Sequence, residues 1–254
     1  MGKTRAMKAL LTILLAGLAL GANNPSSAQN AHGGWRYLVA PYLMFPNMKG
    51  ETGIGELPPV PVDADPGDVF ENLQFGAMLY AEMQNDTWTF SSDLLYMDLE
   101  QDIDERVLIT GGEVGVSQLG WELAAMRRFT PWLELGIGVT YNRLEADVDI
   151  DLQIGTLSAG TTEEWIDPSI VGRATFPIND HWYFQTRANI GGFGVGSDFM
   201  WQLAAEVGYR TSERWAFTFG YRVIDIDYDQ GSAENRFVYD MQTFGPQIKA
   251  AYSF

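Results

Sequence analysis

The sequence has no cysteine, two histidines and far fewer basic than acidic residues. Without cysteine, the chain can form no disulfide, no thiolate nucleophile and no thiolate metal site. Its 16 Lys and Arg residues stand against 33 Asp and Glu residues. This balance argues against a nucleic-acid partner, because phosphate groups are bound by basic side chains. We expect neither a cofactor nor a bound metal.

Long apolar runs are missing beyond the N-terminus. Basic residues near the start precede an apolar stretch over residues 9–22, and Ser26 and Ala28 supply the small side chains of a cleavage site. This pattern predicts a secretory signal peptide over residues 1–28 and a mature domain over residues 29–254. No later run approaches the ~18 apolar residues that a transmembrane helix needs, so strands must carry any membrane span.

The mature chain alternates apolar and polar residues over many short segments. Phe217, Phe219 and Tyr221 alternate with Thr218 and Gly220, for example, and this period of two is typical of a strand. Short turns and longer connections alternate strictly between the segments, as they do in outer-membrane barrels. We predict a closed antiparallel β-barrel, all-β, with ten strands; eight or twelve strands fit the same pattern. The predicted strands lie near residues 35–46, 69–84, 88–98, 106–127, 132–146, 164–178, 182–191, 199–211, 215–226 and 237–254.

Five of the tryptophans stand at the start of a predicted strand, four of them directly after a short turn. Amphipathic indole rings favour the headgroup level, and transmembrane barrels carry aromatic girdles there. A soluble β-sandwich would more often place tryptophan in the middle of a strand, in its core. We predict an aromatic girdle formed by Trp35, Trp88, Trp132, Trp182 and Trp215.

Ionisable residues of both signs fall on the predicted inner faces. The acidic ones come mainly from the second to fifth strands and the basic ones from the sixth to tenth, so they occupy largely opposite walls. Buried charges persist only when they are paired or solvated. We predict a lumen that is closed by a network of ion pairs. Its expected members are Glu82, Asp93, Glu113, Glu122, Glu134, Arg173, Arg187, Glu206, Arg210, Arg222 and Lys249.

The fourth predicted strand changes phase. Val114 and Val116 have the opposite parity to Leu119, and a bulge near residues 117–118 would bring both sets to the outer face. Prolines also fall within predicted strands, although proline cannot donate to a ladder, and we expect them at bulges or rims. These prolines are Pro41, Pro168 and Pro246.

Acidic residues alternate through the predicted loops, as at Asp225, Asp227 and Asp229. This run fails to match an EF-hand, because Gly231 is one place late for the invariant glycine and Arg236 replaces the bidentate glutamate. Strands that continue beyond the membrane with hydrated acidic faces explain such runs. Divalent cations that bridge to lipopolysaccharide phosphates are a second interpretation.

Neither histidine is placed for catalysis. His32 lies in the stub after the predicted signal peptide, and His181 lies in a predicted periplasmic turn. Neither can orient a nucleophile or activate a water molecule on the outer side of the membrane. We therefore predict that the protein is not an enzyme.

The chain ends on Tyr252 and Phe254, and this aromatic-x-aromatic ending resembles the signal by which Gram-negative bacteria recognise outer-membrane barrels for insertion. The second half is similar to a widespread group of small proteobacterial outer-membrane barrels, and more distantly to OmpA-type and OmpW-type barrels. That resemblance implies membrane anchoring or passage of small apolar molecules. The glycine run within it predicts a tight hairpin or a segment folded inward over the lumen. The matching segments are Asp167-Pro168, Gly172-Arg173, residues 191–198 with Trp201, Gly220-Tyr221-Arg222 and Gly245-Pro246.

These observations predict an outer-membrane protein of a Gram-negative bacterium, with a closed or very narrow lumen and a structural or interaction role. One alternative is a channel or transporter for small hydrophobic or cationic solutes. Another is a soluble periplasmic β-sandwich. The expected partners are outer-membrane lipid and lipopolysaccharide, together with the barrel assembly machinery during insertion.

Overall fold

The structure is a computed structural model that describes residues 34–56, 58–102, 109–152 and 155–254. The chain divides into two units, Met1–Gly34 and Trp35–Phe254, and the predicted signal peptide lies outside the described residues. No helix in the described part of the chain is long and apolar enough to cross a membrane. The elements of the second unit are β1 (Arg36–Met44), β2 (Asn47–Ile54), β3 (Val60–Ala64), α2 (Pro66–Glu71), β4 (Leu73–Gln84), β5 (Trp88–Asp102), β6 (Ile109–Arg128), β7 (Leu133–Leu152), β8 (Gly155–Pro177), β9 (Trp182–Gly191), β10 (Phe199–Arg210), β11 (Trp215–Gln230), η1 (Ala233–Asn235) and β12 (Phe237–Ser253).

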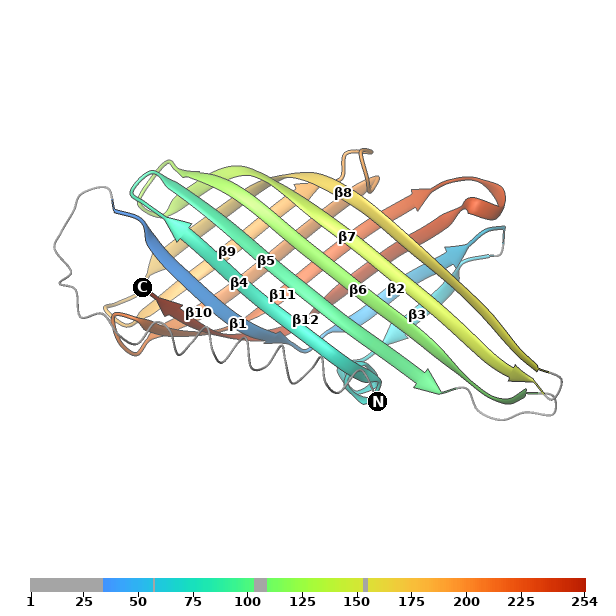
Figure 1. The fold of residues 1–254 in the computed structure, drawn as a ribbon. Helices are drawn as coiled ribbons and strands as arrows, with labels where there is room; N and C mark the ends of the chain where they lie inside the picture. Colours follow the sequence, from blue (N-terminus) through green and yellow to red (C-terminus); the bar gives the residue numbers. More distant parts are fainter. Residues whose placement is uncertain (1–33, 57, 103–108, 153–154) are drawn as a thin grey trace. The chain divides into compact units, whose positions relative to one another are not determined.

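Ten of these strands close into an antiparallel barrel (Figure 1). The order around the barrel is β1 and then β4 to β12, and the pairing of β1 with β12 closes the ring. The predicted ten-stranded barrel is confirmed, and the sandwich alternative is wrong because one sheet closes on itself. Following the paired residues from Leu38 on β1 through β4 to β12 leads to Gly50 on β2 and not back to Leu38. This offset means that the strands are tilted relative to the barrel axis.

The outer surface carries a belt of exposed apolar side chains. On β11, Phe219 and Tyr221 are 64% and 46% exposed, whereas Thr218 and Arg222 on the alternate positions are buried inside the barrel. Further along the same outer face the residues become acidic, as at Asp227. Soluble proteins rarely expose an apolar surface of this extent, and a lipid-facing barrel requires one. The acidic runs continue as strand beyond the belt, as the sequence predicts.

The four short turns lie at one end of the barrel and share a hydrogen-bonding pattern. In the first turn, Asn85 Oδ1 accepts hydrogen bonds from the backbone N–H groups of Thr87 (2.8 Å) and Trp88 (2.7 Å). Such side-chain turns reproduce the geometry of a backbone turn. We call this end the turn side and the opposite end the loop side. The corresponding acceptors in the other three turns are Thr130, Asn179 and Ser212.

The tryptophans that follow these turns lie on the outer surface. Each is between 39% and 46% exposed, and Trp35 lies beside the first turn, with its ring centroid 5.9 Å from that of Phe90. Their position at the edge of the apolar belt is the one that an interfacial girdle occupies. The five residues are Trp35, Trp88, Trp132, Trp182 and Trp215.

The strands β1 and β2 form one line along β12, with a break at Phe45 and Pro46. Both pair with β12 in the same register. On the other side, β1 pairs with β4 as far as Pro41, and β2 pairs with β3. Among the described pairings, no ladder joins the β2–β3 hairpin to β4. The helix α2 packs near the break, with 5.4 Å between the ring centroids of Phe70 and Phe45, and Pro246 accepts a hydrogen bond from Phe45 N (2.9 Å).

Two expectations about individual strands are wrong. The strand β6 pairs with β5 and β7 without a bulge near residues 117–118, so Val114 and Val116 point into the barrel, on the same face as Glu122. Residues 47–68, which the prediction leaves as a connection between the strands near 35–46 and 69–84, contain β2, β3 and the start of α2. Both differences place additional side chains inside the loop-side half of the barrel.

Candidate functional site: the barrel interior

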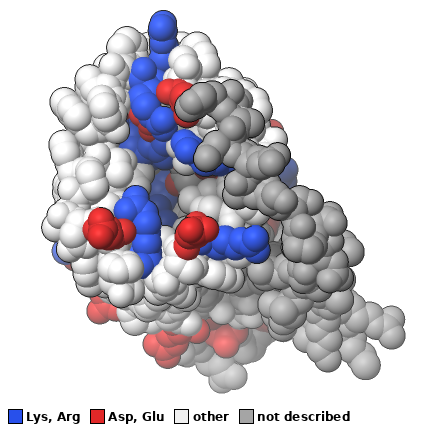
Figure 2. Space-filling view, turned by 90° about the vertical axis from the view of Figure 1, so that its left-hand side faces the viewer, with Lys and Arg blue, Asp and Glu red and all other residues white. Residues whose placement is uncertain are grey.

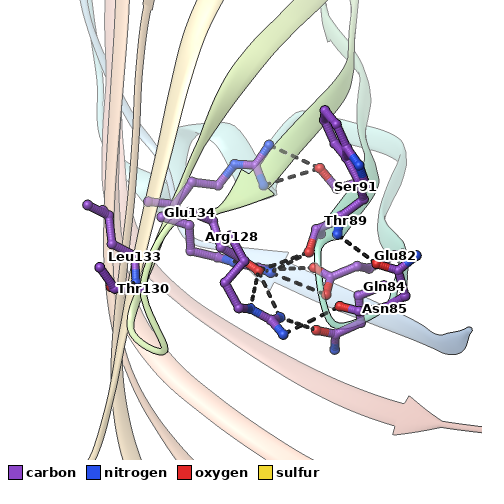
Figure 3. Close-up of polar contacts among 12 residues, drawn as sticks. Glu82, Gln84, Asn85, Thr89, Ser91, Arg128, Thr130, Leu133 and Glu134 are labelled. Atoms are coloured by element: carbon purple, nitrogen blue, oxygen red, sulfur yellow. Dashed lines mark hydrogen bonds and ion pairs between the residues drawn. The ribbon is translucent and has the colours of Figure 1, made fainter. Parts of the chain in front are cut away.

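The interior near the turn side is crossed by a network around Arg173 on β8. Its guanidinium forms ion pairs with Glu82 on β4 and Glu134 on β7. Arg128 Nη2 lies 2.9 Å from Glu134 Oε1, and the Thr89 hydroxyl donates a hydrogen bond of 3.0 Å to the same oxygen. Figure 3 shows Arg128, Thr89 and Glu82 gathered near Glu134. The pairing offsets the cost of removing these charges from water.

A second group of contacts joins β9 to the opposite wall. Arg187 forms an ion pair with Glu122 on β6 and donates hydrogen bonds of 3.2 Å to the Ser91 hydroxyl on β5. Asn189 donates to the other oxygen of Glu122. Both oxygens of this buried carboxylate therefore have a donor.

A third group spans the interior from β11 to β5. Arg222 Nη1 lies 3.1 Å from Asp93 Oδ2 and donates to the Tyr42 hydroxyl at 3.0 Å, while Tyr42 donates to Asp93 Oδ1 at 2.7 Å. Gln202 Oε1 accepts two further hydrogen bonds from the same guanidinium, at 3.1 and 2.6 Å. A planar guanidinium with several partners is fixed in both position and orientation.

The remaining expected members of the network lie in three places. Glu206 is buried between Lys249 (2.8 Å) and the side-chain amide of Gln247 (2.6 Å). Glu113 is a correction: it is exposed on the outer face, because β6 continues without the expected bulge. Arg210 lies at the turn-side mouth, with its guanidinium 4.5 Å from the ring centroid of Tyr183.

A vestibule of about 340 Å³ leads from the turn side to these groups. Figure 2 shows Lys and Arg side chains gathered in and around a hollow at this end. Basic side chains outnumber acidic ones in the lining, although the whole chain has a net charge of −17. The basic residues are Arg128, Arg173, Arg187, Arg210, Arg214, Arg222 and Lys249, and the acidic ones are Glu82, Asp93, Glu134, Glu206 and Glu213.

Three cavities follow one another through the interior, and neighbouring cavities share lining side chains. The vestibule adjoins a cavity of about 60 Å³, which in turn adjoins a loop-side cavity of about 650 Å³. The first shared set, here named the ionic layer, consists of Asp93, Gln202 and Arg222. The second, named the apolar layer, consists of Met97, Gln118, Tyr239 and Met241.

Two residues of the apolar layer, Tyr239 and Met241, belong to a buried apolar cluster that the sequence pattern did not predict. Trp165 on β8 stacks on Tyr228 on β11, with 4.2 Å between ring centroids, and reaches Tyr239 on β12 at 6.1 Å. The sequence does contain a signal for this cluster, because Val114 and Val116 have the same parity as the inward-facing Glu122. This shared parity indicates an apolar interior at this level. The buried members are Leu144, Trp165, Met200, Ile226, Tyr228, Phe237, Tyr239 and Met241.

The glycine run joins β9 to β10 and is anchored to the interior by Asp167. Ser197 donates to this carboxylate from its backbone N–H (2.6 Å) and its hydroxyl (2.8 Å), and the Asn142 amide and Trp165 indole each donate at 2.9 Å. A Cβ added at Gly196 would lie 2.7 Å from Asp167 Oδ1. The run is a tight turn whose end folds inward.

His181 lies in a turn, and its Nδ1 is 3.1 Å from the backbone oxygen of Arg210. His32 falls outside the described residues. Within the described ranges, no group of three or more His, Asp and Glu side chains is arranged to hold a metal ion.

No family model and no curated protein matches the sequence. Solved structures match it in fold. The outer-membrane protease OmpT of Escherichia coli has a TM-score of 0.56 at 9% identity, over 90% of this chain and 100% of that one. The chain has the fold of a Gram-negative outer-membrane β-barrel. Ail, the attachment invasion locus protein of Yersinia pestis, matches at a TM-score of 0.37 and 9% identity over 88% and 100% of the two chains. The toluene transporter TodX of Pseudomonas putida matches at 0.32 and 10% over 88% and 90%.

The closed barrel and its exposed apolar belt place this protein in the outer membrane of a Gram-negative bacterium. At 9% identity, the likeness to OmpT extends to the fold alone. The role of this barrel has to be argued from its own interior.

Proposed function

We propose that this protein is a sealed outer-membrane barrel that conducts no ions and has a structural or interaction role. The observation that supports this proposal most strongly is the pair of layers across the interior. An ion that entered the vestibule would meet the ionic layer, in which Asp93 and Arg222 already satisfy each other. It would then meet the apolar layer, where Met97, Tyr239 and Met241 are each 3–5% exposed.

The same layers argue against the alternative that the protein is a channel or transporter for small cationic or hydrophobic solutes. The carboxylates of the interior are already paired with Arg173, Arg187 and Arg222, so a small cation could bind them only by displacing a guanidinium, which makes cation passage unfavourable. A hydrophobic solute would find an apolar cavity on the loop side, but it would then have to cross the ionic layer. Binding on the loop side therefore fits the interior better than passage through it.

Single-channel recording in a planar bilayer tests the closed lumen. We expect no steady openings from the wild type, or from a variant that shortens both members of two ion pairs, Asp93–Arg222 in the ionic layer and Glu122–Arg187 beside it. That variant is Glu122→Ser, Arg187→Ser, Asp93→Ser and Arg222→Ser. A variant of the apolar layer, Tyr239→Ala with Met241→Ala, should also stay silent, because one layer remains in each.

Combining the two sets shortens side chains in both layers at once and should produce conductance. Heat-modifiable gel mobility shows whether each variant is folded, and recordings are compared only among folded ones. Steady conductance of the wild type would overturn the proposal. If the combined variant does not fold, the wild type and the single-layer variants still decide the question.

We also propose that lipid and lipopolysaccharide surround the apolar belt and that the barrel assembly machinery inserts the chain. The placement of the C-terminus supports this. The aromatic ring of Phe254 is 66% exposed on the outer surface, and Tyr252 lies beside it with 6.2 Å between ring centroids. Cross-linking of an assembling chain to the machinery, lost when both aromatic residues are changed to serine, is the expected result.

A further inference from the structure

The loop-side cavity is the largest of the three cavities described above, at about 650 Å³. Cavities of this size lie within the range that holds drug-sized organic ligands. Its walls come from β5, β6, β7 and β12, from the β2–β3 hairpin and from α2. Most of the lining side chains are apolar, and they include Val62, Leu99, Val114, Val116, Leu144 and Met241.

Around the loop-side cavity, apolar side chains point inward and polar side chains point outward, which is the reverse of the arrangement in the apolar belt. Val116 points inward while its neighbour Ser117 points outward, and Leu144 points inward between Arg143 and Glu145 on the outer face. Strands that span lipid have the opposite arrangement. This part of the barrel is therefore an apolar cup with a hydrated exterior.

Several apolar side chains of the cup remain accessible. Leu99, Val114 and Val116 are only partly buried, and Ile54 and Val60 of the β2–β3 hairpin are 49% and 62% exposed. Covering apolar surface is favourable by about 25 cal/mol per Å². The cup thus presents a surface whose burial by an apolar molecule would stabilise the complex.

The charges around the cup select against anions. Asp63, Asp68 and Glu100 contribute to its lining, and the chain as a whole has a net charge of −17. A negatively charged ligand would be repelled on approach and on binding. At the base, the Gln118 amide donates to the Tyr239 hydroxyl at 3.1 Å, which keeps the floor of the cup uncharged.

We propose that the loop-side cavity binds an uncharged apolar organic molecule. The inference rests on the proposed closed lumen, because the apolar layer forms the floor of the site. Among the described pairings no ladder joins the β2–β3 hairpin to β4, and α2 lines the cup next to this gap.

Thiol protection tests the proposal, because the natural chain has no cysteine and each introduced thiol is unique. Val116→Cys places a thiol in the cup, and Ser117→Cys places the matched control on the outer face of the same strand. The probe is N-phenyl-1-naphthylamine, and its sulfonated analogue 8-anilino-1-naphthalenesulfonate is the anionic comparator. At ten times its Kd, the neutral probe should slow alkylation by N-ethylmaleimide about tenfold at Val116→Cys. Neither Ser117→Cys nor the anionic analogue should show this effect.

Filling the cup with a larger side chain gives an independent test, which is read out by the fluorescence of the bound probe. Val116→Trp should abolish the fluorescence increase of the neutral probe, whereas Leu119→Trp, on the lipid-facing side of β6, should retain it. Equal protection of both thiols, or binding that survives Val116→Trp, would overturn the inference. So would binding in amphipol that is lost in liposomes, because lipid chains would then be the occupant.

Conductance of the same preparations keeps the two proposals apart. A folded, silent barrel that fails to bind the probe contradicts only the apolar site. A conducting barrel contradicts the closed lumen, whether or not the probe binds.

Discussion

Asp167 accepts four hydrogen bonds, and none of the donors is charged. The donors come from β7, from β8 and from the glycine run, so one carboxylate ties a loop to two strands. Hydrogen bonds to a carboxylate are stronger than those between neutral groups. The close approach of Gly196 explains why a glycine occupies that position, since any Cβ would press on the carboxylate and on the backbone of Ile166.

Replacing Asp167 by Asn should destabilise the barrel. The amide keeps the size of the side chain but has one acceptor oxygen for four donors, and each unsatisfied buried donor costs about 1–3 kcal/mol. Thermal unfolding followed by gel mobility measures the loss. Ser169→Ala is the matched control on the same strand, because the buried Ser169 hydroxyl has no hydrogen-bond partner among the described residues. Equal stability of Asp167→Asn and the control would contradict the anchoring role.

At the loop side, burial and the neighbouring Asp240 raise the pKa of Asp227. The two residues are directly opposite each other on β11 and β12. A carboxyl whose pKa is raised in the folded state destabilises the fold at neutral pH, and this effect disappears as the pH falls through the raised pKa.

Asp240→Asn should therefore lower the pKa of Asp227 and stabilise the fold at pH 7, by less than about 1 kcal/mol because the site is mostly exposed. This stabilisation should disappear as the pH falls through the raised pKa of Asp227, because the repulsion is lost when that carboxyl is protonated. Carboxyl ¹³C titration by NMR measures the shift. Hydrogen bonds from Arg236 lower the pKa of Asp229, and this value should not move. An unchanged pKa of Asp227 would contradict the cross-strand repulsion.

At the scale of elements, the closure of the barrel depends on the pairing of its first and last strands, β1 and β12. Tyr37 N donates to Phe254 O at 3.1 Å, Phe254 N donates to Tyr37 O at 3.0 Å, and the two rings stack with 5.7 Å between centroids. The terminal residue therefore contributes both to the ladder and to the outer surface.

Deleting Phe254 should reduce the folded fraction more than Phe254→Ala does. The deletion removes two backbone hydrogen bonds, worth about 1 kcal/mol each, whereas the alanine variant removes only the ring. Refolding into lipid vesicles, scored by heat-modifiable mobility, measures both. Phe129→Ala is the control, since Phe129 is a comparably exposed aromatic residue on the turn side. A deletion that refolds like the wild type would show that closure does not depend on this contact.

The strands could be predicted because lipid and lumen impose opposite demands on neighbouring residues. Phe219 and Arg222 on β11 illustrate the pattern, and the short turns punctuate it. Residues 47–68 could not be predicted in this way. They lie beyond the belt, where no lipid requires one face to be apolar, and the prolines at 58, 59 and 61 obscure the strand pattern.

The interior was less predictable than the wall. Parity alone assigns Arg173 and Glu82 to inner faces, but their meeting across the lumen depends on the tilt of the strands, which no single segment encodes. Val114 and Val116 show the complementary error. Apolar residues are expected to face lipid, but this expectation fails where the barrel continues beyond the apolar belt and its interior becomes apolar.

On the scale of the whole molecule, the barrel has different chemistry at its two ends. The turn-side vestibule is lined by more basic than acidic residues, the middle is crossed by the ionic layer and the apolar layer, and the loop side holds an apolar cup inside an acidic exterior. This gradient supports the proposed sealed barrel, in which the two layers lie between the vestibule and the cup. It does not fit a uniform aqueous pore, whose lining is polar throughout.

One-sided labelling of reconstituted barrels tests this account most directly. Ala216→Cys lies in the turn-side vestibule, and Val116→Cys lies in the cup. With a membrane-impermeant thiol reagent, the first thiol should react only from the turn side and the second only from the loop side. A third thiol at Phe219→Cys, in the lipid-facing belt, should react from neither side. Reaction of either interior thiol from both sides, or free reaction at the belt position, would contradict a sealed barrel embedded in lipid.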